Sequence, residues 1–154
     1  MTRPSEQTPS PSVAERQHWM SVLARAHVED LERYCDELPE MPAYQCLRPA
    51  ETGLAMVRGR TGGTGSAFNL GEVTLSRCVV ELATGCRGFG YVRGRDRRHA
   101  ELAALLDALM QEAPRQHGPA LITPLYRRWQ QDREATGRKA AATRVDFMTM
   151  VRGS

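Results

Sequence analysis

The stretch from Tyr44 to Arg95 constrains the fold more than any other part of the chain. It contains four short runs rich in β-branched, aromatic and other apolar residues, separated by glycine, as is typical of strands joined by tight turns. The runs are YQCLR, LAMVRGR, VTLSRCVVEL and FGYVRGR. No helical pattern separates them, and strands that follow one another directly favour an antiparallel sheet.

The run VTLSRCVVEL also predicts which side chains share a face of that sheet. Successive side chains of a strand point to opposite faces. Cys78, Val80 and Leu82 therefore lie on one face. The other face carries four residues and is polar in part: Leu75, Arg77, Val79 and Glu81.

Helical patterns flank the sheet on both sides. Ser12 and Glu15 are spaced as a capping box, and an apolar stripe with helical spacing follows them until Pro39. After the sheet, Asp96 is a plausible N-cap for a helix that ends at Pro114.

A second helix is predicted to begin at Thr123, with Pro124 in its first turn, and to stop at Gly137. RKAAATR then follows as a linker. The last apolar run, VDFMTMV (145–151), predicts a returning strand inside the sheet, because it is apolar on both faces.

The sequence thus predicts an α+β domain over residues 13–154. We expect an antiparallel sheet of about five strands, with an N-terminal helix before it and two helices before the returning C-terminal strand. A chain of 154 residues is long enough to bury one core. Residues 1–12 are expected to form a disordered tail, because MTRPSEQTPSP has few side chains that a core could bury.

Composition argues against several functional classes. No apolar run is long enough to span a membrane and no signal core is present, so we expect a cytoplasmic protein. The four cysteines show no CxxC spacing and the four histidines form no HExxH motif, so no metal site is expected. The net charge is only +3 and no nucleic-acid recognition motif is present, so we expect no nucleic-acid partner.

Arginine is concentrated beside glycine. Only one of the 21 basic residues is lysine, and the triplet Val-Arg-Gly occurs three times, the last copy at 151–153. Residues two apart on a strand share a face, so Arg58 is expected to point with Arg60, and Arg93 with Arg95. If the strands pair, up to four of these guanidinium groups would gather in one region, where they could bind phosphate or carboxylate, and Arg77 is a further candidate for this role.

The alternative is a network of surface ion pairs. Its acidic members would be four nearby carboxylates: Glu51, Glu72, Glu81 and Asp96.

The loop TGGTG (61–65) has two interpretations. It is not a Walker loop, because no GKS or GKT is present, and no βαβ unit surrounds it as a dinucleotide-binding loop requires. The amides of Gly62, Gly63, Thr64 and Gly65 could form an anion-binding nest. The pattern favours instead a hairpin turn in which glycine supplies positive φ.

No motif in the sequence supplies a complete catalytic site. No serine or cysteine lies in a nucleophile motif, and Glu51, Glu72 and His99 have no spacing that pairs an acid with a base.

Four segments together resemble one family, the G subunit of bacterial carbon–phosphorus lyase (the PhnG family). They are RQHWMSVLARA, LRPAETGLAMVRGRTGGTGSAFNLGEVTLSRCVVEL, GYVRGRDRRHAELAALLDAL and AATRVDFMTMVRG. The resemblance extends from about Ala14 to Gly153. It implies a role in the use of phosphonates as a phosphorus source, and assembly with the H, I and J subunits of that system.

The resemblance also implies a reaction. With the H, I and L proteins, this subunit would support displacement of adenine from ATP by a phosphonate, giving a ribose 1-phosphonate 5-triphosphate. The nucleosidase chemistry is expected on the I subunit. ATP would be a substrate of the complex, and this chain alone is expected to bind no cofactor. The family carries no catalytic residue over to this chain.

Two roles remain open under this resemblance. In the first, the chain is an accessory subunit that docks on the I subunit. In the second, it participates directly, with Arg58, Arg60 and the TGGTG amides binding the triphosphate. Glu51 and Glu72 are then the only nearby carboxylates that could stabilise positive charge at the anomeric carbon.

Overall fold

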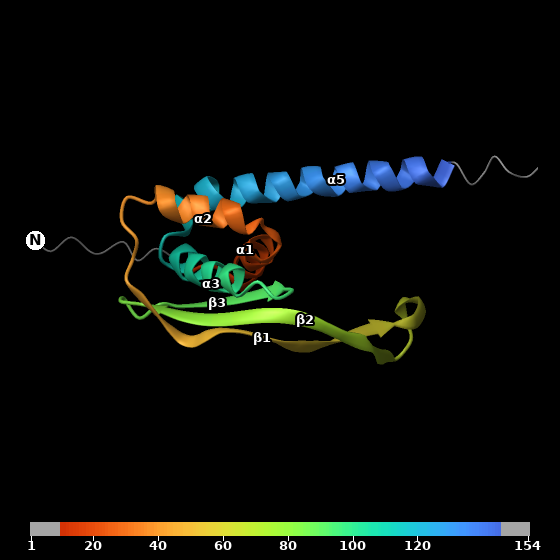
Figure 1. Cartoon of the computed structure of the whole chain (residues 1–154), viewed down its shortest axis with the longest axis horizontal. Helices are drawn as coiled ribbons and strands as arrows, with labels where there is room; N and C mark the ends of the chain where they lie inside the picture. The colour runs from red at the N-terminus through yellow and green to blue at the C-terminus, as the bar shows by residue number, and fades with distance from the viewer. Residues whose placement is uncertain (1–9, 146–154) are drawn as a thin grey trace, which may run out of the picture.

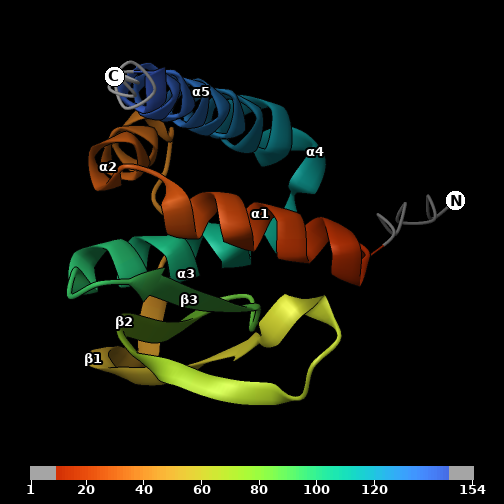
Figure 2. The same ribbon diagram turned by 90° about the vertical axis from the view of Figure 1, so that its right-hand side faces the viewer.

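The computed structural model describes residues 10–145, which form one sheet covered on one side by helices. The three antiparallel strands are β1 (Tyr44–Arg60), β2 (Ala67–Leu82) and β3 (Arg87–Arg93), in the order β1-β2-β3. Figures 1 and 2 show the sheet at the bottom, α1 and α3 above it, and α2 and α5 furthest from it. The α+β class is therefore confirmed.

The expected five strands are wrong, because the described part of the chain contains three. YQCLR and LAMVRGR, predicted as two strands, are joined in β1, which runs 17 residues through Pro49 and Gly53. β1 lies at the edge of the sheet, where a proline without an N–H can be accommodated. Except for Val145, which belongs to a helix, the predicted returning strand lies outside the described residues.

The N-terminal helix begins as predicted but is interrupted. α1 (Val13–Arg25) has the full capping box, in which Glu15 N donates to Ser12 Oγ at 3.2 Å and Ser12 N donates to the Glu15 carboxylate at 2.8 Å. The chain becomes extended at Ala26 (ψ 158°), and α2 (Val28–Glu37) then starts. Acidic residues in the first turn of α2 favour a new helix N-terminus there. The expectation of one continuous N-terminal helix is therefore wrong.

The later helices also depart from the prediction. α3 (Arg97–Glu112) has the predicted cap, with His99 N donating to Asp96 Oδ1 at 3.0 Å. It is followed by the short α4 (Pro114–His117) and a π-helical turn, η2 (Gly118–Ile122). α5 (Thr123–Val145) runs on through Gly137 and the predicted linker. Alanine and basic residues follow Gly137, and their high helix propensity offsets the cost of one glycine.

Two glycines bring α3 against the sheet. A Cβ at Gly88 would overlap the carbonyl oxygen of Ala104, and a Cβ at Gly90 would overlap that of Ala100. β3 therefore packs backbone to backbone against α3. Apart from the buried Ser76, the helix-covered face of β2 from there to its end is apolar, and Cys78, Val80 and Leu82 are buried there as the alternation predicts.

One buried carboxylate ties α1, α3 and β3 together. Asp107 is fully buried on α3 and accepts from Arg16 Nη2 at 2.9 Å, Trp19 Nε1 at 2.7 Å and the Phe89 backbone N–H at 2.9 Å. A buried charge is tolerated only when it is paired and hydrogen-bonded, as here. Along residues 10–145, we find no helix that is both long enough and apolar enough to cross a membrane.

Candidate interaction site

The hairpin of β1 and β2 extends beyond the rest of the sheet. β3 ends at Arg93, which lies opposite Leu75 of β2, and Leu75 in turn lies opposite Gly53 of β1. Past this row only the two strands continue. We call residues 54–74 the arm; Figure 1 shows it projecting past β3, with the turn at its far end.

The tip of the arm confirms the hairpin interpretation of TGGTG. Thr61–Gly63 form a single 3₁₀ turn between β1 and β2, in which Gly62 (φ 64°) and Gly63 (φ 76°) both have positive φ. Gly65 donates its N–H to the Thr61 carbonyl at 3.3 Å, and the N–H of Thr64 is directed to the same oxygen. A Cβ at Gly65 would approach that oxygen to 2.9 Å. The turn therefore requires glycine for its backbone shape.

Arg58 and Arg60 share a face of the arm close to its tip. Arg58 lies opposite Asn69, Arg60 lies opposite Ala67, and both are exposed. Within residues 10–145, neither guanidinium forms an ion pair. The structure therefore presents two adjacent forks, each able to bind a carboxylate or phosphate in bidentate fashion.

The other arginines do not join this pair. Arg93 lies at the end of β3, on the row of Gly53, at the base of the arm. Gly94 has a φ of 99° and ends the strand, so Arg95 lies beyond β3. The expectations that four guanidinium groups gather in one region, and that Arg93 and Arg95 share a strand face, are therefore wrong. The third Val-Arg-Gly copy lies outside the described residues.

Arg77 is engaged in the ion-pair network that formed the alternative interpretation. Glu51 Oε1 accepts from Arg77 Nε at 2.7 Å and from Arg48 Nε at 2.8 Å. The hydrogen bond from Arg77 is the main reason that the pKa of Glu51 is lowered, and the charge of Arg48 lowers it further. Glu51 therefore stays ionised, which does not suit a general acid.

Two further carboxylates also have structural partners. Arg87 pairs with Glu81 at 2.8 Å and lowers its pKa. Asp96 caps α3.

Glu72, the second carboxylate considered for chemistry, lies on the arm opposite Met56. Glu72 is separated along β2 from Arg77, the residue that pairs with Glu51. The two carboxylates are therefore not next to each other. Among the described residues, no group of three His, Cys, Asp or Glu side chains is placed to hold a metal ion. The carboxylates considered for chemistry, Glu51 and Glu72, are not arranged as a nucleophile beside a base.

Apolar side chains on the arm are the feature that the sequence reasoning missed. Leu54, Met56, Phe68 and Leu70 are all exposed. They are four of the nine large apolar residues found exposed in the described chain, although the arm is a small part of it. Their signal in the sequence is that LAMV and AFNL lack a regular alternation with polar residues. That irregularity is unexpected for strands with one face in water.

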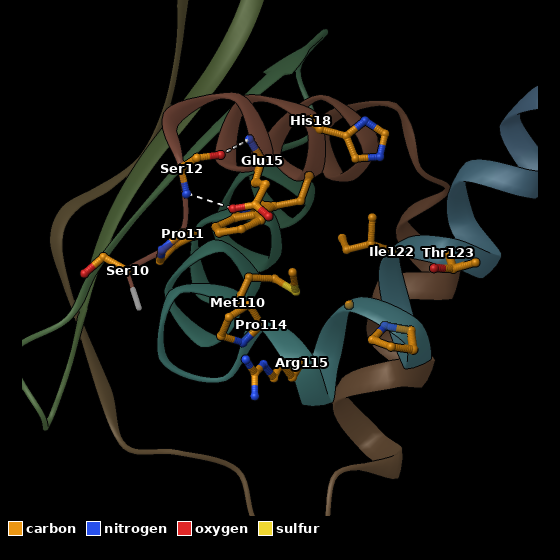
Figure 3. A pocket seen from close by; sticks show the side chains of 13 residues that line it. Ser10, Pro11, Ser12, Glu15, His18, Met110, Pro114, Arg115, Ile122 and Thr123 are labelled. Atoms are coloured by element: carbon orange, nitrogen blue, oxygen red, sulfur yellow. Dashed lines mark hydrogen bonds between the residues drawn. The ribbon is translucent and has the colours of Figure 1, made fainter. Parts of the chain in front are cut away.

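A large cleft lies on another side of the molecule. It measures about 600 Å³ and has Trp19, Met110 and Ile122 among its apolar lining residues, with Arg115 and His18 also beside it. Figure 3 shows that Glu15, which also lines it, is occupied by the capping box. None of the residues singled out from the sequence as site candidates lines this cleft, so it does not extend the site on the arm.

These features define the class of protein: an α+β domain with a packed body and a projecting, partly apolar arm. The comparisons with known proteins then show its family. The family model for "Phosphonate metabolism protein PhnG" matches residues 14–153. The chain is also 45% identical over 142 residues to the α-D-ribose 1-methylphosphonate 5-triphosphate synthase subunit PhnG of Rhizobium meliloti (strain 1021), covering 92% of this chain and 91% of the relative. The chain therefore belongs to the PhnG family of phosphonate metabolism proteins.

Proposed function

We propose that this chain is the G subunit of an α-D-ribose 1-methylphosphonate 5-triphosphate synthase. In this role it supports the displacement of adenine from ATP by a phosphonate, as an accessory subunit that docks on the I subunit through the arm. The similarity to the Rhizobium meliloti subunit over nearly the whole of both chains supports the reaction.

One structural observation carries the accessory role. Four large apolar side chains are exposed on an arm that makes no contribution to the core. Apolar groups gathered in this way mark a surface that binds another protein. In contrast, the acidic residues considered for chemistry are separated, and Glu51 is held in ion pairs.

A second candidate function rests on the tip of the arm. Arg58 and Arg60 share a face, next to a turn in which Gly62 and Gly63 are exposed. In this alternative the two guanidinium groups bind the triphosphate of ATP in an active site shared with the I subunit. The guanidinium fork suits phosphate oxygens as well as it suits carboxylates.

The test is to prepare the chain alone and with its I, H and L partners, and to measure both co-purification and ATP-dependent adenine release. The chain alone should release no adenine. Replacing both arginines (Arg58→Ala with Arg60→Ala) should weaken assembly with the I subunit if the arm docks. If the arm binds triphosphate, assembly should survive while the apparent affinity for ATP falls.

The lysine pair is the matched control for charge. Arg58→Lys with Arg60→Lys should restore little in either case, because the planar bidentate contact is lost. Replacing Arg138 on α5 by alanine should change neither measurement. A double-alanine variant that assembles and turns over like the parent would contradict both roles for the arginines.

A further inference from the structure

The arm has one face that continues the helix-covered face of the sheet. Thr52 lies opposite Ser76, which is fully buried beneath the helices. Leu54 and Met56 follow Thr52 in steps of two along β1, so their side chains lie on the same face as Thr52 and Ser76. We call this face the helix side. Leu54 is 67% exposed and Met56 is 56% exposed. The helices over the body therefore leave these side chains uncovered.

The opposite face of the arm, which we call the outer side, also carries exposed apolar side chains, whereas Thr74 and Glu72 lie beside Leu54 and Met56 on the helix side. Val57 lies opposite Gly71, and Gly59 lies opposite Phe68, so these residues share the outer side. The register shift between Val57 and Arg58 leaves Leu70 as an extra residue of β2. Its side chain lies over Gly59, 2.5 Å from where a Cβ would stand. Phe68 is 44% exposed and Leu70 is 61% exposed.

A sheet with only one face against a core normally alternates between apolar and polar residues. Strands that are apolar on both faces occur where both faces are covered. Within the described chain, nothing covers the arm in this way. α5 extends in the same direction in Figure 1, but residues 130–134 of that helix are exposed. Residues 10–145 therefore do not supply this cover.

The charges of the arm indicate which charges a partner should carry where it surrounds the tip of the arm. Between residues 54 and 74 the only ionisable groups are Arg58, Arg60 and Glu72, so the tip is cationic. Arg58 and Arg60 lie on the helix side, beyond Met56. A partner that encloses the apolar part of the arm would therefore meet these guanidinium groups at its deepest point, where carboxylates would complement them.

We infer that the arm is inserted into a cleft of the partner protein that covers both of its faces, rather than lying with one face on a flat surface. The cleft has apolar walls on two sides, one for Leu54 and Met56 and one for Phe68 and Leu70. Carboxylates at its inner end bind Arg58 and Arg60. The inference rests on the proposed docking to the I subunit and states how that docking is made.

The experiment measures the dissociation constant of the full-length chain with the I subunit, for variants of each face separately. Leu54→Glu and Met56→Glu change the helix side, and Phe68→Glu and Leu70→Glu change the outer side. Val13→Glu is the matched control, because Val13 is 74% exposed on α1, outside the arm. Each arm variant should weaken binding by roughly tenfold or more, as expected for a buried apolar contact, while the control stays within about twofold of the parent.

The outcomes distinguish whether the arm is inserted into a cleft from whether the arm binds the I subunit at all. If variants of only one face weaken binding, the arm docks on a flat surface and this inference is wrong, while the proposed function stands. If no arm variant weakens binding, the proposed docking fails as well. Leu54→Ser and Leu70→Ser, which add no charge, repeat the comparison, and a circular dichroism spectrum like that of the parent shows that each variant is folded.

The carboxylates are tested by reversing the charge at the tip. Arg58→Glu with Arg60→Glu should weaken binding at least fivefold more than the double alanine variant does, because acidic side chains would then face acidic side chains. Equal weakening by the two variants would show that no carboxylates lie at the inner end of the cleft, and would overturn that part of the inference.

Discussion

The strand β2 belongs to two regions with opposite requirements. From Ser76 to Leu82 every second side chain is buried beneath the helices. From Ala67 to Glu72 every residue is exposed, and the only neighbouring strand is β1. The body is stabilised by contacts within the chain, whereas the arm keeps apolar side chains uncovered. The same kind of secondary structure therefore serves stability in one region, and in the other it leaves side chains free for the docking that we propose.

The first way to test this contrast is to remove the buried carboxylate of the body. Asp107→Ala should lower the free energy of unfolding by about 3–5 kcal/mol, because it leaves the buried indole and amide donors of Trp19 and Phe89 without an acceptor and Arg16 without its partner. Urea denaturation followed by circular dichroism measures the effect. Asp132→Ala removes an exposed side-chain hydrogen bond with His27 and should cost less than about 1 kcal/mol. Similar losses for the two variants would contradict the central role of Asp107.

A smaller effect is expected at the contact between β3 and α3. Gly90→Ala should lower the free energy of unfolding by about 1–3 kcal/mol or prevent folding, because the new Cβ overlaps the backbone of α3. Gly53→Ala is the control, since nothing lies within 4 Å of a Cβ there. We expect it to be neutral or slightly stabilising. Should Gly90→Ala behave like Gly53→Ala, the helix and strand are not packed backbone to backbone.

At the tip of the arm the expected cost is smaller still. Gly62→Ala places a side chain at a φ of 64°, which should cost about 1 kcal/mol in the same denaturation assay. Gly62→Asn should cost less, because asparagine tolerates this conformation better than alanine does. The reverse order would mean that backbone conformation does not determine the preference at this position.

The apolar side chains of the arm are expected to affect stability least, although they are expected to affect binding most. Leu54→Ser with Leu70→Ser should change the free energy of unfolding by less than about 0.5 kcal/mol, because neither side chain packs in the core. The same variant should reduce self-association of the isolated chain, measured by sedimentation velocity at increasing concentration. A loss above 1 kcal/mol would show that the arm is part of the stable body, and the contrast drawn above would fail.

The parts of the fold that could be predicted are those with local signals. The capping box of Ser12, the cap at Asp96 and the alternation of buried residues from Cys78 to Leu82 depend on near neighbours in the chain, and all three are present. The hairpin was predictable because positive φ at Gly62 and Gly63 is a property of glycine itself.

The errors arose where tertiary position overrides a local signal. Pro49 and Gly53 appeared to separate two strands, but an edge strand tolerates both. Gly137 appeared to end a helix, although α5 continues through it. In both cases the sequence shows a residue that destabilises a strand or a helix. It does not show whether the surrounding structure makes that destabilisation small.

The candidate site was predicted only in part. Arg58 and Arg60 share a face because strand alternation requires it, and the structure agrees. Their separation from Arg93 could not be deduced, because it depends on β3 ending opposite Leu75. The exposed apolar residues of the arm were missed for a similar reason. Leu54 and Leu70 have the composition of core residues, and only the three-dimensional arrangement shows that no core reaches them.

The backbone contact of Gly88 and Gly90 with α3 has a consequence for amide hydrogen exchange. In the body, a strand held this closely cannot separate from the helix by rotating a side chain, so its amide protons should exchange only when the whole domain opens. The amides near the tip of the arm need only local fraying. Along β2, from Ala67 to Leu82, protection factors should therefore rise from nearly none to the value of global unfolding, within a single strand. When the partner covers the arm, that gradient should disappear.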